Sequence, residues 1–324
     1  MRRLWVQIHL WLGLTLGVLG IFIGVSGSIL VYGHEVDAWL NPQRYAVTGS
    51  QPALGFGDYA ARVTQGRIVS LRLPEAEGLP VVAMSREGGQ FFRVWIDPPT
   101  GRVLDAAAGG GFVGWVHRFH ENLTLREYWG REIVGLVGFA MLISSLSGLY
   151  LWWPARGRLR EALGARAGLA RSRNLHYLFG FYGSLLLALL SFTGIWLAYV
   201  DGGRSVVAAF APVSQRAAAP QGTYRVNLTE KGEPVTLFVD ARSGTVVRRV
   251  DSSRTSGDRF LAAQRALHAG DAFGAARFLL FLAGLLPAVL AVTGTMMWLR
   301  QRQARPSPLR PPVPGGPCRA PSSR

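Results

Sequence analysis

The chain has 324 residues, of which 49% are hydrophobic and 17% are charged, and its formal net charge is +16. Soluble proteins carry about 25% charged residues, so the deficit indicates apolar segments that lie in lipid. The single cysteine excludes, within one chain, a disulfide framework, a thiolate zinc site, an iron–sulfur cluster and a covalent CxxCH haem site.

Four apolar runs, taken in chain order, predict membrane-spanning helices over residues 4–32, 133–153, 175–200 and 278–299. Each run reaches the length of about 20 residues that a helix needs to cross a hydrocarbon core. The first run follows two arginines, but it is about twice as long as the apolar part of a signal peptide, and no small-residue cleavage pattern follows it. We therefore predict an α-helical membrane protein with a retained N-terminal anchor.

The charge distribution orients these helices. Arginines precede the first helix and crowd the loop 154–174 and the tail 300–324, whereas the charges of residues 34–130 are nearly balanced. Because cytoplasmic loops of membrane proteins carry the excess of Lys and Arg, both termini are predicted to be cytoplasmic. The basicity therefore indicates topology, and we expect the lipid bilayer but no nucleic acid as a partner.

The domain boundaries follow from this topology. Transmembrane segments cover residues 1–33, 131–153, 175–200 and 273–299, and outer modules cover 34–130 and 201–272. The Pro-rich tail, which carries Cys318, is predicted to be disordered. In the outer modules we expect a helix at 56–65 and strands at 67–73, 79–85, 91–96, 235–239 and 245–250, because Val, Ile and Phe alternate with Pro- and Gly-bearing turns there.

The histidines mark an internal repeat. Each half begins with a histidine that is followed four and eighteen residues later by glycine: His9, Gly13 and Gly27, then His176, Gly180 and Gly194. The second and fourth helices each follow a histidine and end in a small residue beside glycine: His120 with Ser147-Gly148, and His268 with Thr293-Gly294. The sequence thus predicts two duplicated halves, each with two transmembrane helices and one α+β module.

Histidine in a membrane segment is costly unless it is used, and imidazole is a natural ligand of haem iron and other metals. We expect His9 and His176 to meet at the cytoplasmic face, and His120 and His268 to meet at the outer face. Gly13 and Gly180 lie one helical turn beyond their histidines and leave room for a flat group. The chain from His9 to His34 spans about 37 Å as a helix, so two centres are expected.

At these residues the chain resembles the PepSY-associated transmembrane family, which includes bacterial inner-membrane ferric-siderophore reductases. The matching pieces are HLWLGL, SGSILVYGHEVDAWLNP, VHRFHENL, GLYLWWP, ALHAGDAFG and VTGTMMWLR, and VWIDPPTGRVL is similar to a PepSY module. The resemblance implies two b-type haems with His9, His176, His120 and His268 as iron ligands. It also implies electron transfer to a ferric siderophore or another ferric chelate, from a quinol, flavin or protein donor.

Three points stay open at this stage. His34 and His117 compete for the outer ligand positions, since both lie near the outer ends of helices. The chain could instead be a non-enzymatic PepSY membrane protein that binds peptide or regulates a partner. A copper or zinc site built from His117, His120 and His268 is a third reading, because the first two share one helical face.

Overall fold

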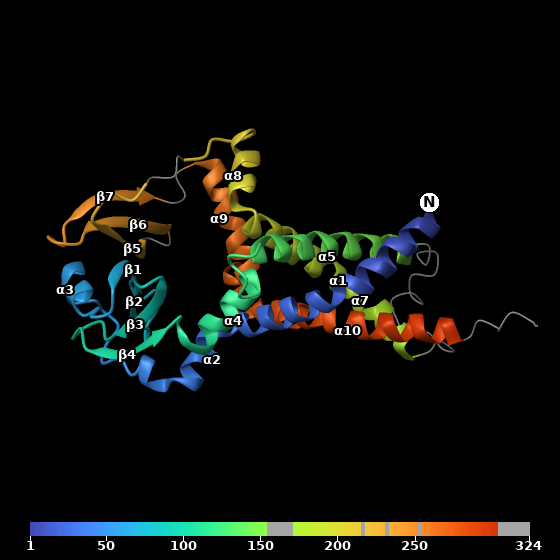
Figure 1. The fold of residues 1–324 in the computed structure, drawn as a ribbon, viewed down its shortest axis with the longest axis horizontal. Helices are drawn as coiled ribbons and strands as arrows, with labels where there is room; N and C mark the ends of the chain where they lie inside the picture. The colour runs from blue at the N-terminus through green and yellow to red at the C-terminus, as the bar shows by residue number, and fades with distance from the viewer. Residues whose placement is uncertain (154–170, 215–217, 231–232, 252–254, 304–324) are drawn as a thin grey trace, which may run out of the picture.

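The computed structural model describes residues 1–153, 171–214, 218–230, 233–251 and 255–303. Most of the predicted cytoplasmic loop 154–174 and of the predicted disordered tail 300–324, with Cys318, lies outside the described residues. The described chain forms a long helical bundle with a β-sheet region at one end (Figure 1).

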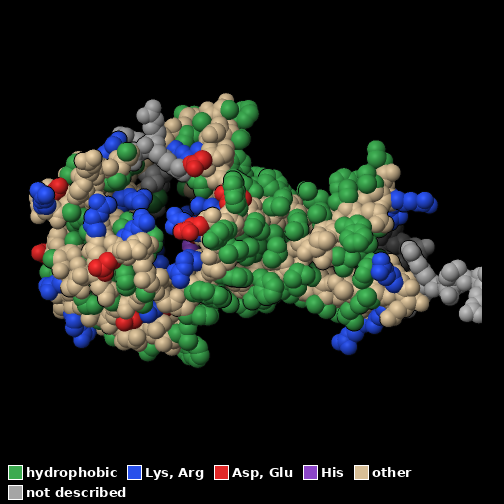
Figure 2. Space-filling model, viewed as in Figure 1, with side chains coloured by type: hydrophobic (Ala, Val, Ile, Leu, Met, Phe, Trp, Pro, Cys, Tyr) green, Lys and Arg blue, Asp and Glu red, His purple; other side chains and the backbone are tan. Residues whose placement is uncertain are grey.

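Four long helices form the bundle: α1 (Arg2–Val31), α5 (Gly130–Trp152), α7 (Arg171–Ala198) and α10 (Arg277–Gln303). Each is long and apolar enough to cross a membrane, and only 22% to 28% of its most apolar stretch is buried inside the protein. Hydrophobic side chains cover the visible surface of the bundle (Figure 2). This exposed apolar surface suits a lipid environment, and the four predicted membrane helices are confirmed.

Glycine permits a close backbone contact in the bundle, where α1 packs on α10. A Cβ atom at Gly24 would lie 2.3 Å from the carbonyl oxygen of Gly284. Beside this contact, the hydroxyl of Ser28 donates a hydrogen bond of 2.7 Å to the carbonyl of Phe281. Small residues that let two backbones touch are typical of helix association in lipid, where the hydrophobic effect does not drive packing.

Shorter helices connect the bundle to the sheet region. They are α2 (Gly33–Leu40), the 3-10 helix η1 (Pro42–Tyr45), α4 (Gly111–Asn122), α8 (Val200–Ala208), α9 (Ser256–Ala269) and the 3-10 helix η3 (Asp271–Ala276). Helix α4 packs beside α1 and leads into α5, while α9 packs beside α7 and leads into α10. The chain therefore presents two equivalent short helices at the sheet end of the bundle, and these carry His120 and His268.

The strands form one seven-stranded sheet in the order β4-β3-β2-β1-β5-β6-β7. The strands are β1 (Arg67–Arg72), β2 (Val81–Glu87), β3 (Gln90–Ile96), β4 (Val103–Ala108), β5 (Thr223–Glu230), β6 (Glu233–Asp240) and β7 (Val246–Asp251). Strands β1 and β5 pair in parallel, and this pairing joins the two outer segments. The two modules predicted from the sequence are therefore two halves of a single sheet.

The two faces of this sheet differ. One face carries the apolar core, including Leu71, Val81 and Val226, and it is covered by α3 (Phe56–Ala61) through the buried Tyr59. Helix α3 lies on the side of the sheet away from the bundle (Figure 1). The opposite face therefore turns toward the helices.

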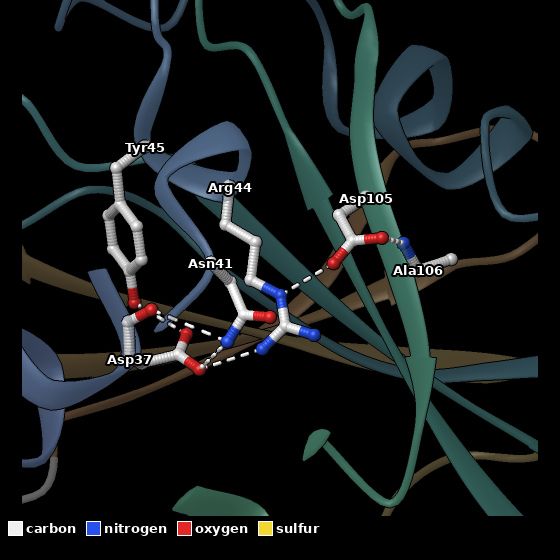
Figure 3. Close-up of polar contacts among 6 residues, drawn as sticks. All are labelled: Asp37, Asn41, Arg44, Tyr45, Asp105 and Ala106. Atoms are coloured by element: carbon white, nitrogen blue, oxygen red, sulfur yellow. Dashed lines mark hydrogen bonds and ion pairs between the residues drawn. The ribbon is translucent and has the colours of Figure 1, made fainter. Parts of the chain in front are cut away.

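A buried ion-pair cluster fastens the sheet to the segment that follows α2 (Figure 3). The guanidinium of Arg44 donates to Asp37 at 2.7 Å and to Asp105 at 2.6 Å, and it stacks over the Trp95 ring at 3.9 Å. The Tyr45 hydroxyl donates to the second oxygen of Asp37 at 2.8 Å. Because Asp37 and Arg44 are both about 95% buried, this cluster fixes the position of the sheet relative to α1 and α2.

Candidate functional site

Two histidine pairs lie at opposite ends of the bundle. His9 on α1 and His176 on α7 have ring centroids 6.2 Å apart and planes inclined by 86°. His120 on α4 and His268 on α9 have centroids 6.1 Å apart and planes inclined by 43°. The structure thus brings together the same pairs that the sequence repeat predicts, each made of one histidine from either half.

Each of the four imidazoles is held by a hydroxyl group on a neighbouring long helix. The Nδ1 atoms lie 3.0–3.1 Å from these hydroxyl oxygens, in the combinations His9 with Ser147, His120 with Ser26, His176 with Thr293, and His268 with Thr193. Two rings are also within hydrogen-bond distance of a backbone carbonyl: His9 Nδ1 of Ser144, and His120 Nδ1 of Ile23. The same contact therefore recurs at all four positions.

The hydroxyl groups set the tautomer of the rings. Each donates its own proton to a carbonyl one turn back on its helix, as Ser26 does to Ile23 and Thr193 does to Leu189. Since each hydroxyl proton is used in this way, the oxygen accepts and the histidine Nδ1–H donates. The lone pair of each neutral ring is then on Nε2, which forms no hydrogen bond within the described residues. This is how proteins orient a histidine that binds a metal.

A glycine follows each of these hydroxyl residues and lets the ring lie against the helix backbone. A Cβ atom would come within 2.9–3.3 Å of the ring Cε1 atom at all four: Gly27 against His120, Gly148 against His9, Gly194 against His268, and Gly294 against His176. Each ring therefore lies against a Ser/Thr-Gly dipeptide, whose hydroxyl orients the ring and whose glycine leaves room for it.

The pairs are separated by most of the membrane thickness. His9 and Ser26 lie on the same helix, so the rings of His9 and His120 are about 25 Å apart along the axis at 1.5 Å per residue. The hydrocarbon core of a bilayer is about 30 Å thick. One pair therefore lies near each end of the membrane-spanning region, consistent with two separate centres.

The pair at the sheet end of the bundle, His120 and His268, borders a large cavity. Its volume is about 780 Å³, and its walls include His120, His268, Gly27 and Gly194. Cofactor pockets typically measure about 300–1,000 Å³. Burial lowers the pKa of His120 to about 4, with a further contribution from His268, and burial also lowers the pKa of His268. Both rings are therefore neutral at physiological pH, which is the state that a metal ligand requires.

The other proposed site residues lie outside the pairs. His34 and His117 border the same cavity, but the ring of His34 packs on Tyr45 with centroids 4.7 Å apart, and His117 lies 3.8 Å from Glu121. A Cβ atom at Gly13 would contact nothing within 4 Å, and one at Gly180 would contact Leu290 alone. These two glycines leave space beside the helices but do not contact the histidine rings.

The spacing of the two rings in each pair fits a haem iron bound by two histidines. Two imidazoles that bind one metal ion from opposite sides through bonds of about 2.0 Å place their ring centroids about 6.3 Å apart. The observed values of 6.2 and 6.1 Å agree with this spacing. By contrast, no group of three His, Cys, Asp or Glu side chains in the described residues could hold a metal ion. The alternative three-histidine copper or zinc site lacks the grouping that it needs.

The hydroxyl partners were not identified from the sequence. Ser147 and Thr293 stand in the small-Gly pairs that mark the repeat, and Ser26 and Thr193 precede the glycines eighteen residues beyond His9 and His176. The available signal was the recurrence of a Ser/Thr-Gly dipeptide in all four long helices. Each of the four dipeptides contacts one of the four histidines, and the dipeptide and its histidine always lie on different helices.

Comparison with known proteins gives one family. The model of the PepSY-associated TM region matches residues 6–301 and so covers all four long helices and the sheet between them. No curated protein matches the chain.

Proposed function

The chain belongs to the PepSY-associated transmembrane family, and from this we propose that it is an inner-membrane electron-transfer protein that reduces ferric iron on the outer side. The observation that carries the proposal is the pair of adjacent imidazoles at each end of the bundle, whose ring centroids lie 6.2 and 6.1 Å apart and whose Nδ1 atoms contact hydroxyls. A b-type haem bound by His9 and His176 and another bound by His120 and His268 would supply one-electron transfer across the membrane.

The protein's own residues would keep both centres rigid and dry. The four hydroxyls hold the imidazole planes in place, so that little reorganisation accompanies a change of charge. The cavity beside the outer pair is bounded by Met141, Val137 and Leu187 among other apolar side chains, which exclude water from the ring edges. Two neutral imidazoles would hold each haem iron, and a haem held by two histidines would supply electron transfer rather than oxygen chemistry.

The proposal includes an internal duplication and an orientation. Helices α1, α4 and α5 would form one half, and α7, α9 and α10 the other. Equivalent hydroxyl contacts support this assignment, since Ser26 on α1 contacts the histidine of α4 and Thr193 on α7 contacts the histidine of α9. The arginines of the first residues, of the loop 154–174 and of the tail support a cytoplasmic location for the chain termini, because cytoplasmic segments carry the excess of Lys and Arg. The sheet would then lie outside, where the chelate arrives.

Reduction would serve iron release. Fe²⁺ is less charge-dense than Fe³⁺, and hard oxygen chelators such as siderophores hold it less tightly. The proposed substrate is therefore a ferric siderophore or another ferric chelate, and the donor on the inner side is a quinol, a flavin or a protein.

A vesicle assay tests the proposal. The protein is reconstituted into liposomes that contain trapped dithionite, a ferric chelate is added outside, and Fe²⁺ is followed with an external chromogenic chelator. We expect wild-type protein to produce external Fe²⁺ much faster than protein-free vesicles, and His9→Ala and His120→Ala to abolish the gain. Haem-loaded wild-type protein that gives no gain would contradict electron transfer.

A further inference from the structure

The sheet face that turns toward the helices carries several arginines. Register shows this placement: Arg72 lies opposite Val82 and Arg93 opposite Met84, and Val82 and Met84 are two residues apart on β2. Because alternate residues of a strand point to the same face, Arg72 and Arg93 share a face. Arg225 belongs to it as well, since it pairs with Ser70 on the neighbouring strand.

Arg93 reaches the start of helix α4. Its guanidinium carbon lies 3.1 Å from the place where a Cβ of Gly110 would stand, and Gly110 has a φ of +80°. The guanidinium of Arg118 lies in the same way beside Gly109, whose φ is +62°, and Arg118 donates to the carbonyl of Gly109. The absence of side chains here lets two cationic groups approach the backbone at the junction between sheet and helix.

Positive charge is also present in the wall of the cavity beside His120 and His268. Arg265 on α9 lines that cavity and is exposed. Partial desolvation beside the cavity lowers the pKa of His117, although its side chain is still 65% exposed; the charge of Glu121 opposes this shift, and the charges of Arg93, Arg265 and Arg118 add to it. His117 therefore lies within electrostatic reach of an arginine of the sheet and two arginines of the short helices.

The nearby carboxylates are used elsewhere. Glu121 pairs with Arg131 at 2.6 Å, Asp258 accepts from Ser214 and Thr255, and both Asp37 and Asp105 pair with Arg44. No carboxylate in the described residues forms an ion pair with Arg72, Arg93 or Arg265. Burial lowers the pKa of Arg93 and the charge of Arg72 lowers it further, while the charge of Asp37 opposes this shift from beyond ion-pair distance. Figure 2 shows Lys and Arg side chains gathered where the sheet region faces the helices.

We propose that Arg72, Arg93 and Arg265 form an anion-binding cleft that receives a polyanionic ferric chelate beside the outer histidine pair. Guanidinium groups bind oxygen anions through charge-assisted hydrogen bonds, and clustered cations of one sign attract such ligands from solution. A tris-catecholate complex of Fe³⁺ carries three negative charges on hard oxygens and fits this chemistry. The inference rests on the proposed function for the identity of the ligand as a substrate.

Binding is tested apart from reduction with gallium(III) tris-catecholate, a trianion that cannot be reduced under these conditions. The purified full chain in detergent is titrated with this complex and with neutral gallium(III) tris-acetohydroxamate. We expect the trianion to bind more tightly, with an affinity that falls as salt rises. Arg93→Gln and Arg265→Gln should each weaken it about tenfold, the loss expected for one charged hydrogen bond, while Arg93→Lys retains part of the affinity.

Arg249→Gln is the matched control. Arg249 is an exposed arginine that is already paired with Glu230 and Asp251, and it lies opposite Leu237, which packs on the core face of the sheet. Its substitution should leave the trianion affinity unchanged. Thermal unfolding and haem content equal to wild type establish that the glutamine variants are folded.

The outcomes separate the two proposals. Equal affinity for the neutral complex, or a trianion affinity that survives both glutamine substitutions, would overturn the cleft. If the trianion binds as expected but no ferric complex is reduced, the cleft stands and the proposed function fails.

Discussion

Gly27 offers the sharpest perturbation of the outer centre. In Gly27→Ala the new Cβ would lie 2.9 Å from Cε1 of His120, whereas carbon atoms pack at about 3.5 Å or more. The ring must therefore retreat by about 0.6 Å. The hydrogen bonds of Nδ1 to Ile23 and Ser26, now 2.9 and 3.1 Å, would then lengthen to the limit of hydrogen bonding or beyond it.

We expect Gly27→Ala to weaken binding at the outer centre about 10- to 100-fold, the range for loss of an orienting contact to a metal ligand. Helix stability cannot explain such a loss, because alanine favours a helix over glycine by about 1 kcal/mol. The assay is haem content per chain by pyridine haemochromagen after dilution and washing. Gly17→Ala is the control on the same helix, since its Cβ would contact Ala291 at an ordinary 3.8 Å. A Gly27→Ala protein that retains two haems as firmly as wild type would refute the reasoning.

Three further predictions follow from the same contacts. His34→Ala and His117→Ala should each keep two haems per chain, because neither ring belongs to a pair; loss of one haem in either variant would reassign the outer ligands. Thr293→Val keeps the shape of the side chain but removes the acceptor for Nδ1 of His176, so inner haem retention should fall about tenfold in a competition assay with apomyoglobin, and unchanged retention would exclude the hydroxyl contact. Arg44→Ala leaves buried carboxylates without their partner and should destabilise the sheet region by about 3–5 kcal/mol, measured by urea unfolding of the full chain with tryptophan fluorescence; a loss below about 1 kcal/mol would contradict the role of the cluster.

Local patterns in the sequence predict the membrane helices well, because hydropathy over about 20 residues reports a requirement of the bilayer itself. They predict the sheet less completely. Strand β4 (VLDAAA) has few of the residues that favour strands. Strand β5 (TYRVNLTE) was not predicted, although Tyr224, Val226 and Leu228 alternate with polar residues and face the core. The parallel pairing of β1 with β5 joins residues more than 150 positions apart, and no local pattern indicates it.

The histidine pairs could be predicted from the sequence repeat, because two duplicated halves would place equivalent residues about a common axis. The repeat does not show which hydroxyl residue contacts each ring. Ser26 orients His120, and Thr193 orients His268, yet the members of each contact are far apart along the chain and lie on different helices. Only packing of the long helices against the short ones shows which Ser/Thr-Gly dipeptide belongs to which ring.

The absorption spectrum of the purified protein tests the central claim most directly. Protein expressed with adequate haem and purified in detergent is measured with and without dithionite, and haem is quantified per chain. The account predicts two haems per chain, a Soret band, a sharp α-band on reduction and the low-spin signal of bis-histidine iron, with about half of the haem lost in His9→Ala or His268→Ala. A colourless wild-type protein, or one whose haem content is unchanged in both variants, would contradict it.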